Sequence, residues 1–353
     1  MSGPDIRRPE AIDAAWLSRA LQSSGLDAEV ADFTAAPVGS GQIGDSIRFK
    51  LTYARGAGPA TMVGKFPSAD PDSFNTGVML GNYTREVMFY RHLAGGARIR
   101  TPHCLFADVE PATGEFVLLM EDLAPAQQGD QLRGVSLDEA ERVIDEAAKL
   151  HASHWEDETL DDLPWVSGSR AAPASAASPE LVQGLWAAFV DRYNDRLQPK
   201  WIDIGARLST RYPVLGELHR GPRCLTHNDF RPDNMMFGPE AVTTLDWQSF
   251  AFGSGAQDVA YFLAGGLSPE LRRQHEPRLL DRYLAGLRAH GVEGYSRADL
   301  VRDYGRGGFL LFLTAFFAAM VVKRTERGDA MFIQMLGGAS QHILDHDALA
   351  ALG

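Results

Sequence analysis

The chain has 353 residues, and its 46 Asp and Glu against 34 Lys and Arg give a formal net charge of −12. This length predicts two domains or one large bilobal unit, and the acidic balance argues against a nucleic-acid partner. Hydrophobic residues make up 45% of the chain and charged residues 23%, which is typical of a globular protein and not of a disordered one.

Compartment and membrane association follow from a few local features. Cys104 and Cys224 are too few for a disulfide framework, and the first residues show no apolar signal-peptide core, so we expect a cytoplasmic protein. The apolar segment from Phe309 to Val322 has 14 residues, fewer than the ~20 that span a bilayer. We predict a buried core helix there and no membrane partner.

The first third of the chain mixes helical and strand patterns. Residues 47–53 alternate with period two, and a Gly- and Pro-containing turn separates them from a second strand, which predicts a β-hairpin. The expected elements are helices at 9–23 and 77–94, strands at 47–53 and 61–66, and a second hairpin at 103–109 and 116–120.

Helical patterns dominate after Met120. Ser136 and Glu139 form a capping box at the start of a helix that ends near His154. The acidic and Ala/Pro/Ser-rich residues between 156 and 179 are typical of a solvated connector. We therefore predict an α+β chain with a small β-rich lobe, residues 1–121, and a larger mainly α lobe, residues 122–353.

A glycine-rich turn precedes the first hairpin. Gly39, Gly41 and Gly44 match G-x-G-x-x-G, but a dinucleotide-binding fold needs a helix after this motif, and here a strand follows. A glycine turn between strands, followed by a strand lysine such as Lys65, is the arrangement with which kinases cover nucleotide phosphates. A plain glycine-rich hairpin turn remains the alternative.

Lys65 is one of only five lysines, and it lies among apolar residues of its strand. A buried ammonium needs a partner, because an isolated buried charge is costly. Glu86 lies at the edge of the apolar stripe of the following helix and is the expected partner; alternatively it is a surface carboxylate beside Arg85. A strand Lys paired with a helix Glu positions lysine on ATP phosphates.

The strongest signal is the H-x-D-x-x-x-x-N segment that starts at His227, followed by a strand that ends at Asp246. Phosphoryl transfer needs one carboxylate to orient and deprotonate a hydroxyl, and an amide and a second carboxylate to hold Mg²⁺. Asp229, Asn234 and Asp246 supply this set, and Arg231 could neutralise charge on the transferring phosphoryl. Ordinary turn residues, or a metal hydrolase using His227, are the alternatives.

These motifs resemble those of the aminoglycoside phosphotransferase and choline kinase-like superfamily, and most closely its bacterial ecdysteroid-kinase-like members. The resemblance extends from about Val38 to Leu263. It depends on HNDFRPDN from His227, LDWQ from Leu245, DVAYFL from Asp258, LLMEDL from Leu118, LHASHW from Leu150, VGK from Val63 and REVMFY from Arg85.

The resemblance implies a two-lobed protein-kinase-like fold and a role for each matched residue. Asp229 is the catalytic base, and Asn234 and Asp246 are the Mg²⁺ ligands. Lys65 holds the ATP phosphates and is oriented by Glu86. Adenine meets the backbone of a hinge from Met120 through Glu121 to Leu123.

Two positions depart from the family pattern. Asn228 stands where the family often has Gly, and Arg231 stands where aminoglycoside enzymes usually have His. Both departures point away from aminoglycosides as the substrate.

The polar and aromatic residues around these motifs are expected to be structural. We expect His227 to fix its loop by hydrogen bonding, Asp258 to cap a helix or brace that loop, and His151 and His154 to be core or helix-end residues. The aromatic residues at helical spacing from Trp186 to Tyr193 are expected in the core.

The sequence thus predicts an ATP- and Mg²⁺-dependent kinase that phosphorylates a hydroxyl of a metabolite, xenobiotic or antibiotic. The acidic balance favours a cationic acceptor, bound by the helices from about residue 181 to 220 and the C-terminal helices. Two alternatives stay open: an inactive nucleotide-binding regulatory module of the same fold, and a Rossmann oxidoreductase.

Overall fold

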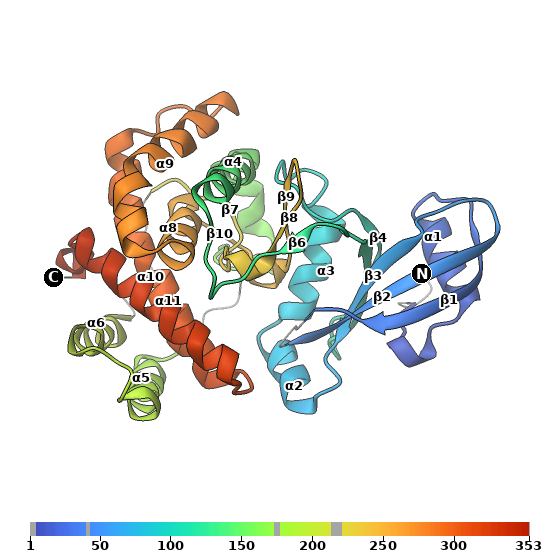
Figure 1. The fold of residues 1–353 in the computed structure, drawn as a ribbon, viewed down its shortest axis with the longest axis horizontal. Helices are drawn as coiled ribbons and strands as arrows, with labels where there is room; N and C mark the ends of the chain where they lie inside the picture. The colour runs from blue at the N-terminus through green and yellow to red at the C-terminus, as the bar shows by residue number, and fades with distance from the viewer. Residues whose placement is uncertain (1–4, 40–42, 173–176, 213–220, 353) are drawn as a thin grey trace. The chain divides into compact units, whose positions relative to one another are not determined.

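The computed structural model describes residues 5–39, 43–172, 177–212 and 221–352. The chain forms two compact units (Figure 1). The first unit contains Met1–Gly96, Thr101–Ala126 and Thr244–Ser249, and the second contains Ala97–Arg100, Gln127–Thr243 and Phe250–Gly353. Gly41 lies outside the described residues, so its predicted place in the glycine turn has no structural counterpart here.

The first unit is built on a five-stranded antiparallel sheet with the order β1-β2-β3-β5-β4. Both predicted hairpins are present in it, because β2 pairs with β3 and β4 pairs with β5. The strands are β1 (Glu29–Pro37), β2 (Gly44–Arg55), β3 (Thr61–Pro67), β4 (Cys104–Glu110) and β5 (Glu115–Glu121).

The alternation of side chains along β3 separates the core from the candidate site. Met62 and Phe66 point into an apolar core, whereas Lys65 lies on the opposite face. Gly64 lies between Met62 and Phe66 on the core-facing side of β3. A Cβ at this position would come within 2.7 Å of the Phe66 ring and 2.9 Å of the Phe49 ring. Glycine at position 64 therefore permits the close packing of the two rings.

Helices complete the first unit, and one of them differs from prediction. The N-terminal helix α1 (Ala14–Ser23) follows a short 3₁₀ turn, η1 (Pro9–Ala11). The single helix expected at 77–94 is wrong, because the structure has α2 (Pro71–Met79) and α3 (Asn82–His92). Gly81, with φ 68°, ends one helix and begins the next in a left-handed conformation that glycine adopts without strain.

The second unit is mainly helical, as predicted. Its helices are α4 (Leu137–Ser153), α5 (Pro179–Tyr193), α6 (Pro199–Thr210), α8 (Gly255–Gly266), α9 (Pro269–Ala289), α10 (Arg297–Val321) and α11 (Glu326–Asp345). The expected capping box begins α4: Ser136 Oγ accepts from Glu139 N at 3.2 Å, and the Glu139 carboxylate accepts from Ser136 N at 2.7 Å.

Short strands carry the loops of the candidate site. Two small sheets form, with the orders β10-β7 and β6-β8-β9. The strands are β6 (Gln127–Gln128), β7 (Cys224–Thr226), β8 (Met235–Phe237), β9 (Val242–Thr244) and β10 (Ala251–Gly253), with the 3₁₀ turns η2 (Glu158–Asp162), η4 (Pro232–Asn234), η5 (Trp247–Ser249) and η6 (Ala348–Leu352). The strand expected to reach Asp246 ends at Thr244, because Asp246 turns the chain with φ 64°.

The core of the second unit contains the predicted aromatic residues of α5, which are Trp186, Phe189 and Tyr193. The apolar segment predicted as a buried helix belongs to α10, which has 25 residues and is therefore longer than expected. By length and composition α10 could cross a membrane. Of its most apolar 18-residue segment, 56% is buried within the protein.

Candidate active site

In the first unit, Lys65 of β3 lies between two carboxylates. Its Nζ is 2.7 Å from Glu86 Oε2 on α3 and 2.8 Å from Asp246 Oδ1. The predicted contact between Lys65 and Glu86 is therefore present. The structure adds Asp246 as a second partner, which the sequence interpretation had assigned only to a metal.

The environment keeps this lysine charged. Only 15% of the Lys65 side chain and 2% of the Glu86 side chain are exposed. Burial by itself lowers the pKa of the Lys65 ammonium, but the charges of Asp246 and Glu86 outweigh it and raise this pKa above its usual value. The trio therefore presents a fixed positive group with a known orientation.

Helix α3 also holds the segment that carries Asp246. The Phe89 ring stacks on the Trp247 ring with centroids 3.9 Å apart and an interplanar angle of 4°. Arg85 Nη1 donates to Gln248 O at 2.9 Å, and Trp247 Nε1 donates to Thr244 O at 3.2 Å. One helix thus fixes both carboxylates that contact Lys65.

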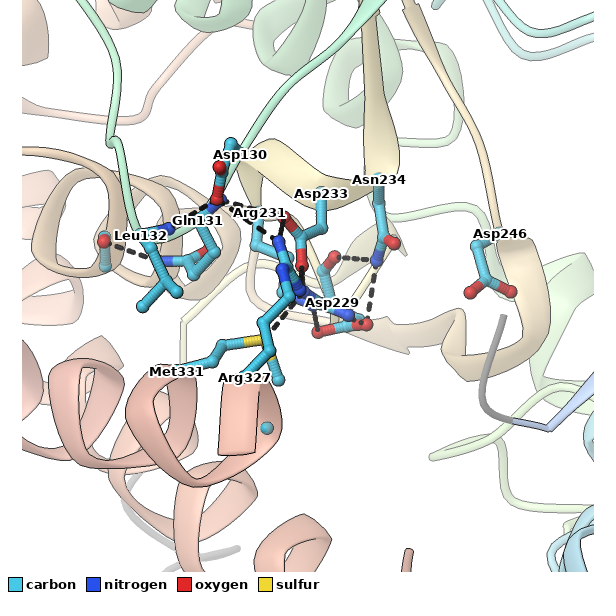
Figure 2. Close-up of polar contacts among 12 residues, drawn as sticks. Asp130, Gln131, Leu132, Asp229, Arg231, Asp233, Asn234, Asp246, Arg327 and Met331 are labelled. Carbon is cyan, nitrogen blue, oxygen red and sulfur yellow. Dashed lines mark hydrogen bonds and ion pairs between the residues drawn. The ribbon is translucent and has the colours of Figure 1, made fainter. Parts of the chain in front are cut away.

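In the second unit, the Asp229 carboxylate is held by three donors. Oδ1 accepts from Tyr261 Oη at 2.8 Å and Arg231 Nε at 3.0 Å, and Oδ2 accepts from Asn234 Nδ2 at 2.7 Å. Figure 2 shows the Arg231 and Asn234 side chains directed at the Asp229 carboxylate. Arg231 Nε also lies 3.2 Å from Oδ2, so these three described side chains fix both oxygens of the carboxylate.

The backbone of this loop is braced by a buried carboxylate. Asp258 of α8 accepts from His227 N at 2.6 Å and Asn228 N at 2.9 Å, and its own neighbour is His151 Nε2 at 3.2 Å. Of the two predicted roles of Asp258, the structure shows the loop brace. His151 is a buried core residue as predicted, and its Nδ1 contacts Tyr283 Oη at 2.7 Å.

The structure shows the geometry of the two residues that begin the loop, His227 and Asn228. His227 Nδ1 accepts from Asp229 N at 3.2 Å, which is the predicted hydrogen bond within the loop. Asn228 has φ 63°, a left-handed conformation that asparagine tolerates better than most residues. The departure from glycine at this position is therefore compatible with the same turn.

Arg231 is enclosed by acidic groups and sulfur. Besides Asp229, its guanidinium donates to Asp233 Oδ2 at 2.8 Å and contacts Met331 Sδ at 3.4 Å. Burial by itself lowers the pKa of the Arg231 guanidinium, but Asp229 and its neighbours outweigh this effect and raise the pKa above its usual value. This side chain therefore remains a cation. The guanidinium contact with Asp229 positions that carboxylate, and the predicted role of Arg231 in neutralising charge on the transferring phosphoryl stays a prediction.

A second arginine, Arg327 of α11, completes this charged network. Its Nη2 lies 2.9 Å from Asp233 Oδ1 and 3.2 Å from Asp130 Oδ1 (Figure 2). Burial raises the pKa of Asp233, but the hydrogen bond from Arg327 and the charge of Arg231 lower it below the usual range. Asp233 therefore stays ionised and ties α11 to the Asp229 loop.

The predicted nucleotide-contacting residues of the first unit lie at the ends of its strands. Gly39 has φ 78°, and a Cβ at Gly44 would lie 3.0 Å from Phe66 O. At the end of β5, Met120 pairs with Val63, Glu121 N donates to His103 O at 2.9 Å, and Leu123 O accepts from Ala126 N at 2.9 Å. Their contact with a nucleotide stays a prediction.

The donor set fits a magnesium ion. Both hydrogen bonds that the Asn234 side chain makes to described residues use Nδ2, at 2.8 Å to Asp229 O and 2.7 Å to Asp229 Oδ2. Its Oδ1 remains for a cation, and amide and carboxylate oxygens are the ligands that Mg²⁺ prefers. Bound Mg²⁺ would supply positive charge against the phosphate oxygens.

Sequence reasoning missed the roles of Tyr261, Asp233 and Arg327. Tyr261 follows Asp258 by three positions on α8, so the two side chains leave the helix on neighbouring turns. One therefore reaches the loop backbone and the other reaches Asp229. That spacing was the available signal, whereas Arg327 lies on a distant helix and left none.

Two fixed sets of groups thus characterise the described residues: a carboxylate oriented by three side-chain donors, and an ammonium held by two carboxylates. On this fold, such groups define a kinase-like phosphotransferase. The sequence profile of the APH family, described as the phosphotransferase enzyme family, matches residues 41–301. The chain therefore belongs to the phosphotransferase enzyme family. No curated protein sequence matches it significantly.

Solved structures share the fold at low sequence identity. An ethanolamine kinase from Plasmodium vivax matches with a TM-score of 0.52 and 10% identity over 87% of this chain and 81% of its own. The ADP-bound aminoglycoside phosphotransferase APH(2'')-Ib matches with a TM-score of 0.51 and 14% identity over 94% and 99%. The predicted kinase-like fold is confirmed.

Proposed function

We propose that the protein is an ATP- and Mg²⁺-dependent kinase that transfers the γ-phosphoryl group to a hydroxyl of a small molecule. The observation that carries this proposal is the Asp229 carboxylate, which three side-chain donors hold in a fixed orientation, as a general base for a hydroxyl requires. The family assignment supports the same reaction class, and the matched aminoglycoside phosphotransferase is ADP-bound.

In the proposed reaction, Asp229 accepts the hydroxyl proton as the acceptor oxygen bonds to the γ-phosphorus and the bond to the ADP oxygen breaks. Positioning and charge stabilisation supply most of the catalysis in such transfers, because the transition state needs little covalent assistance. Tyr261 and Arg231 keep the carboxylate oriented, and Asn234 joins it to the metal-binding set.

Lys65 is proposed to bind the ATP phosphates, with Glu86 as the residue that orients it. Asp246 and Asn234 are the proposed Mg²⁺ ligands. Asp246 would then serve both Lys65 and the metal, and both positive charges would act on the phosphates. The proposed adenine contact is the backbone from Met120 through Glu121 to Leu123, and Gly39, Gly41 and Gly44 are proposed to cover the phosphates.

The acceptor is proposed to be a small alcohol, with a cationic compound favoured by the net charge of −12. The similarity to ecdysteroid-kinase-like members and the cytoplasmic location stay predictions from the sequence. An inactive regulatory module is less favoured, because Asp229, Asn234 and Asp246 are all retained with the side-chain contacts described above.

The test is a screen of the purified protein with Mg–ATP against a library of hydroxyl compounds, with products detected by mass. We expect a product heavier by one phosphoryl group, formed only with Mg²⁺ present. Nucleotide binding without any phosphorylated product across amino alcohols, aminosugars and neutral alcohols would support the inactive module instead.

A further inference from the structure

Two histidines and a glutamate converge in the second unit, and the proposed reaction assigns none of the three a role. Glu276 lies on α9, and His342 and His346 lie one turn apart at the end of α11. One ligand atom from each residue lies within 4.8 Å of the others. Glu276 Oε1 and His346 Nε2 lie 3.0 Å apart.

The hydrogen bonding of His342 fixes which ring nitrogen is free to bind a ligand. Its Nε2 lies 3.0 Å from Tyr304 O, and a carbonyl oxygen only accepts, so Nε2 carries the proton. The other nitrogen, Nδ1, therefore has an unshared pair. His342 is fully buried, and Nδ1 has no hydrogen-bond partner among the described residues. A buried unpaired nitrogen is costly unless a ligand satisfies it.

Helix α10 has glycines where it faces these imidazoles. A Cβ at Gly308 would lie 2.5 Å from His342 Cδ2, and a Cβ at Gly305 would lie 3.2 Å from His346 Cβ. Glycine inside a helix is unfavourable compared with alanine, so its presence here has a packing reason. The glycines let α11 bring both rings close to α10.

The remaining contacts of Glu276 leave one of its oxygens directed at the histidines. Arg272 and Tyr304 both donate to Oε2, whereas Oε1 faces His346. Arg272 also pairs with Asp345, so two carboxylates compensate its charge. Partners of this kind commonly orient the ligands of a metal from outside the coordination shell.

We propose that Glu276, His342 and His346 bind a divalent transition-metal ion, with Zn²⁺ as the best match. Two imidazoles and a carboxylate suit Zn²⁺ and Co²⁺ and disfavour Mg²⁺ and Ca²⁺, which prefer oxygen ligands. Tetrahedral Zn²⁺ with bonds of about 2.0–2.1 Å separates its ligand atoms by roughly 3.3 Å, close to the Glu276–His346 distance. Water completes the fourth position.

The expected role of the ion is to join α9 to α11. His342 Nδ1 and His346 Nε2 are buried, whereas the His346 and Glu276 side chains are 15% and 13% exposed, so the site lies just beneath the surface. None of the three residues belongs to the proposed kinase machinery, so the metal site and the kinase reaction succeed or fail separately.

The test uses the full chain, stripped with a chelator and then titrated with ZnCl₂ or CoCl₂ alone. We expect one ion per chain by elemental analysis, the visible absorption of tetrahedral Co²⁺, and a higher Tm with Zn²⁺. Excess Mg²⁺ should not compete. Absence of a bound ion, or an octahedral Co²⁺ spectrum, would overturn the proposal.

Substitutions then locate the ion. His346→Gln and Glu276→Gln should weaken Zn²⁺ binding at least a hundredfold and abolish the Tm increase, whereas His103→Gln, on an exposed residue of the first unit, should change neither. Circular dichroism of each metal-free variant shows that it is folded. Zn²⁺ binding of unchanged affinity in both variants would mean that the ion lies elsewhere and would refute the site.

Discussion

Lys65 is the positively charged group of the first unit's candidate site. Its replacement should reduce both the use of ATP and the stability of the fold, and the two losses can be measured separately. In Lys65→Met the carboxylates of Glu86 and Asp246 lose their common cation, and the proposed charged contact with ATP is removed. We expect kcat/KM for ATP to fall about 10- to 100-fold, because a hydrogen bond to a charged group contributes about 1.5–3 kcal/mol. Steady-state kinetics with varied ATP measures it.

The matched control is Lys50→Met on the neighbouring strand, where the lysine is exposed. This variant should keep wild-type kcat/KM for ATP. If Lys65→Met has the same ATP kinetics as Lys50→Met, the phosphate-binding role of Lys65 is wrong. Chemical denaturation of both variants separates catalytic loss from instability, since breaking a buried ion pair costs about 3–5 kcal/mol.

Tyr261 is the residue whose contact with Asp229 most directly extends the sequence prediction. Removing only its hydroxyl, in Tyr261→Phe, takes one of three donors from the carboxylate. We expect kcat to fall about tenfold, with KM for ATP unchanged, because a hydrogen bond to a charged group is lost. The pH dependence of kcat should also change, since Asp229 is the proposed base.

Tyr53→Phe serves as the control, because it removes a hydroxyl that donates to Pro59 O in the first unit, among residues with no proposed role in the reaction. An unaltered kcat and pH profile in Tyr261→Phe would show that the contact is structural and does not tune the base.

At the scale of an element, the capping box of α4 makes a pH-dependent contribution to stability. Burial raises the pKa of Glu139, but the Ser136 backbone N–H and Arg133 lower it below the usual value. The contribution is therefore complete above about pH 4.3, the unfolded glutamate value, and is lost as pH falls through the lower folded pKa.

Glu139→Gln should accordingly reduce the free energy of unfolding by about 1 kcal/mol at neutral pH, the usual size of a cap. The difference from wild type should shrink towards about pH 3, as measured by denaturant unfolding at each pH. Asp138→Asn, on an exposed neighbour, should have a smaller effect at every pH. A Glu139→Gln deficit that grows on acidification would contradict the sign of this shift.

Elements with a strong local pattern could be predicted from the sequence, and those set by one backbone torsion or by tertiary packing could not. The two hairpins and the capping box were visible as period-two alternation and as Ser136 with Glu139. The break at Gly81 was missed because apolar spacing continued across it, and only the left-handed φ separates α2 from α3.

The candidate site shows the same division. The contact of Lys65 with Glu86 was predictable, because a buried ammonium requires a carboxylate and the edge of the following helix offers one. Tyr261 was missed because it lies in an apolar run, where the sequence pattern does not distinguish a packed tyrosine from one that hydrogen bonds through its hydroxyl. The contact of Arg327 with Asp233 joins residues 94 positions apart, which no local pattern reveals.

For the whole molecule, the family and fold predict that nucleotide binding stabilises the protein. Mg–ATP at 100 times its Kd should stabilise the folded state by about 2.7 kcal/mol, which a thermal shift assay detects. ATP with a chelator should stabilise less, because Asn234 and Asp246 are proposed to bind the metal. Equal stabilisation with and without Mg²⁺ would contradict that part of the site.

The most direct test of the central claim is phosphoryl transfer from Mg–ATP to an accepted hydroxyl compound, followed by mass, with wild type, Asp229→Asn and Asp32→Asn. We predict that Asp229→Asn loses about 10²–10⁴-fold in kcat, the usual contribution of a general base, while Asp32→Asn, at an exposed position of β1, stays at the wild-type rate. Wild-type turnover by folded Asp229→Asn would contradict it.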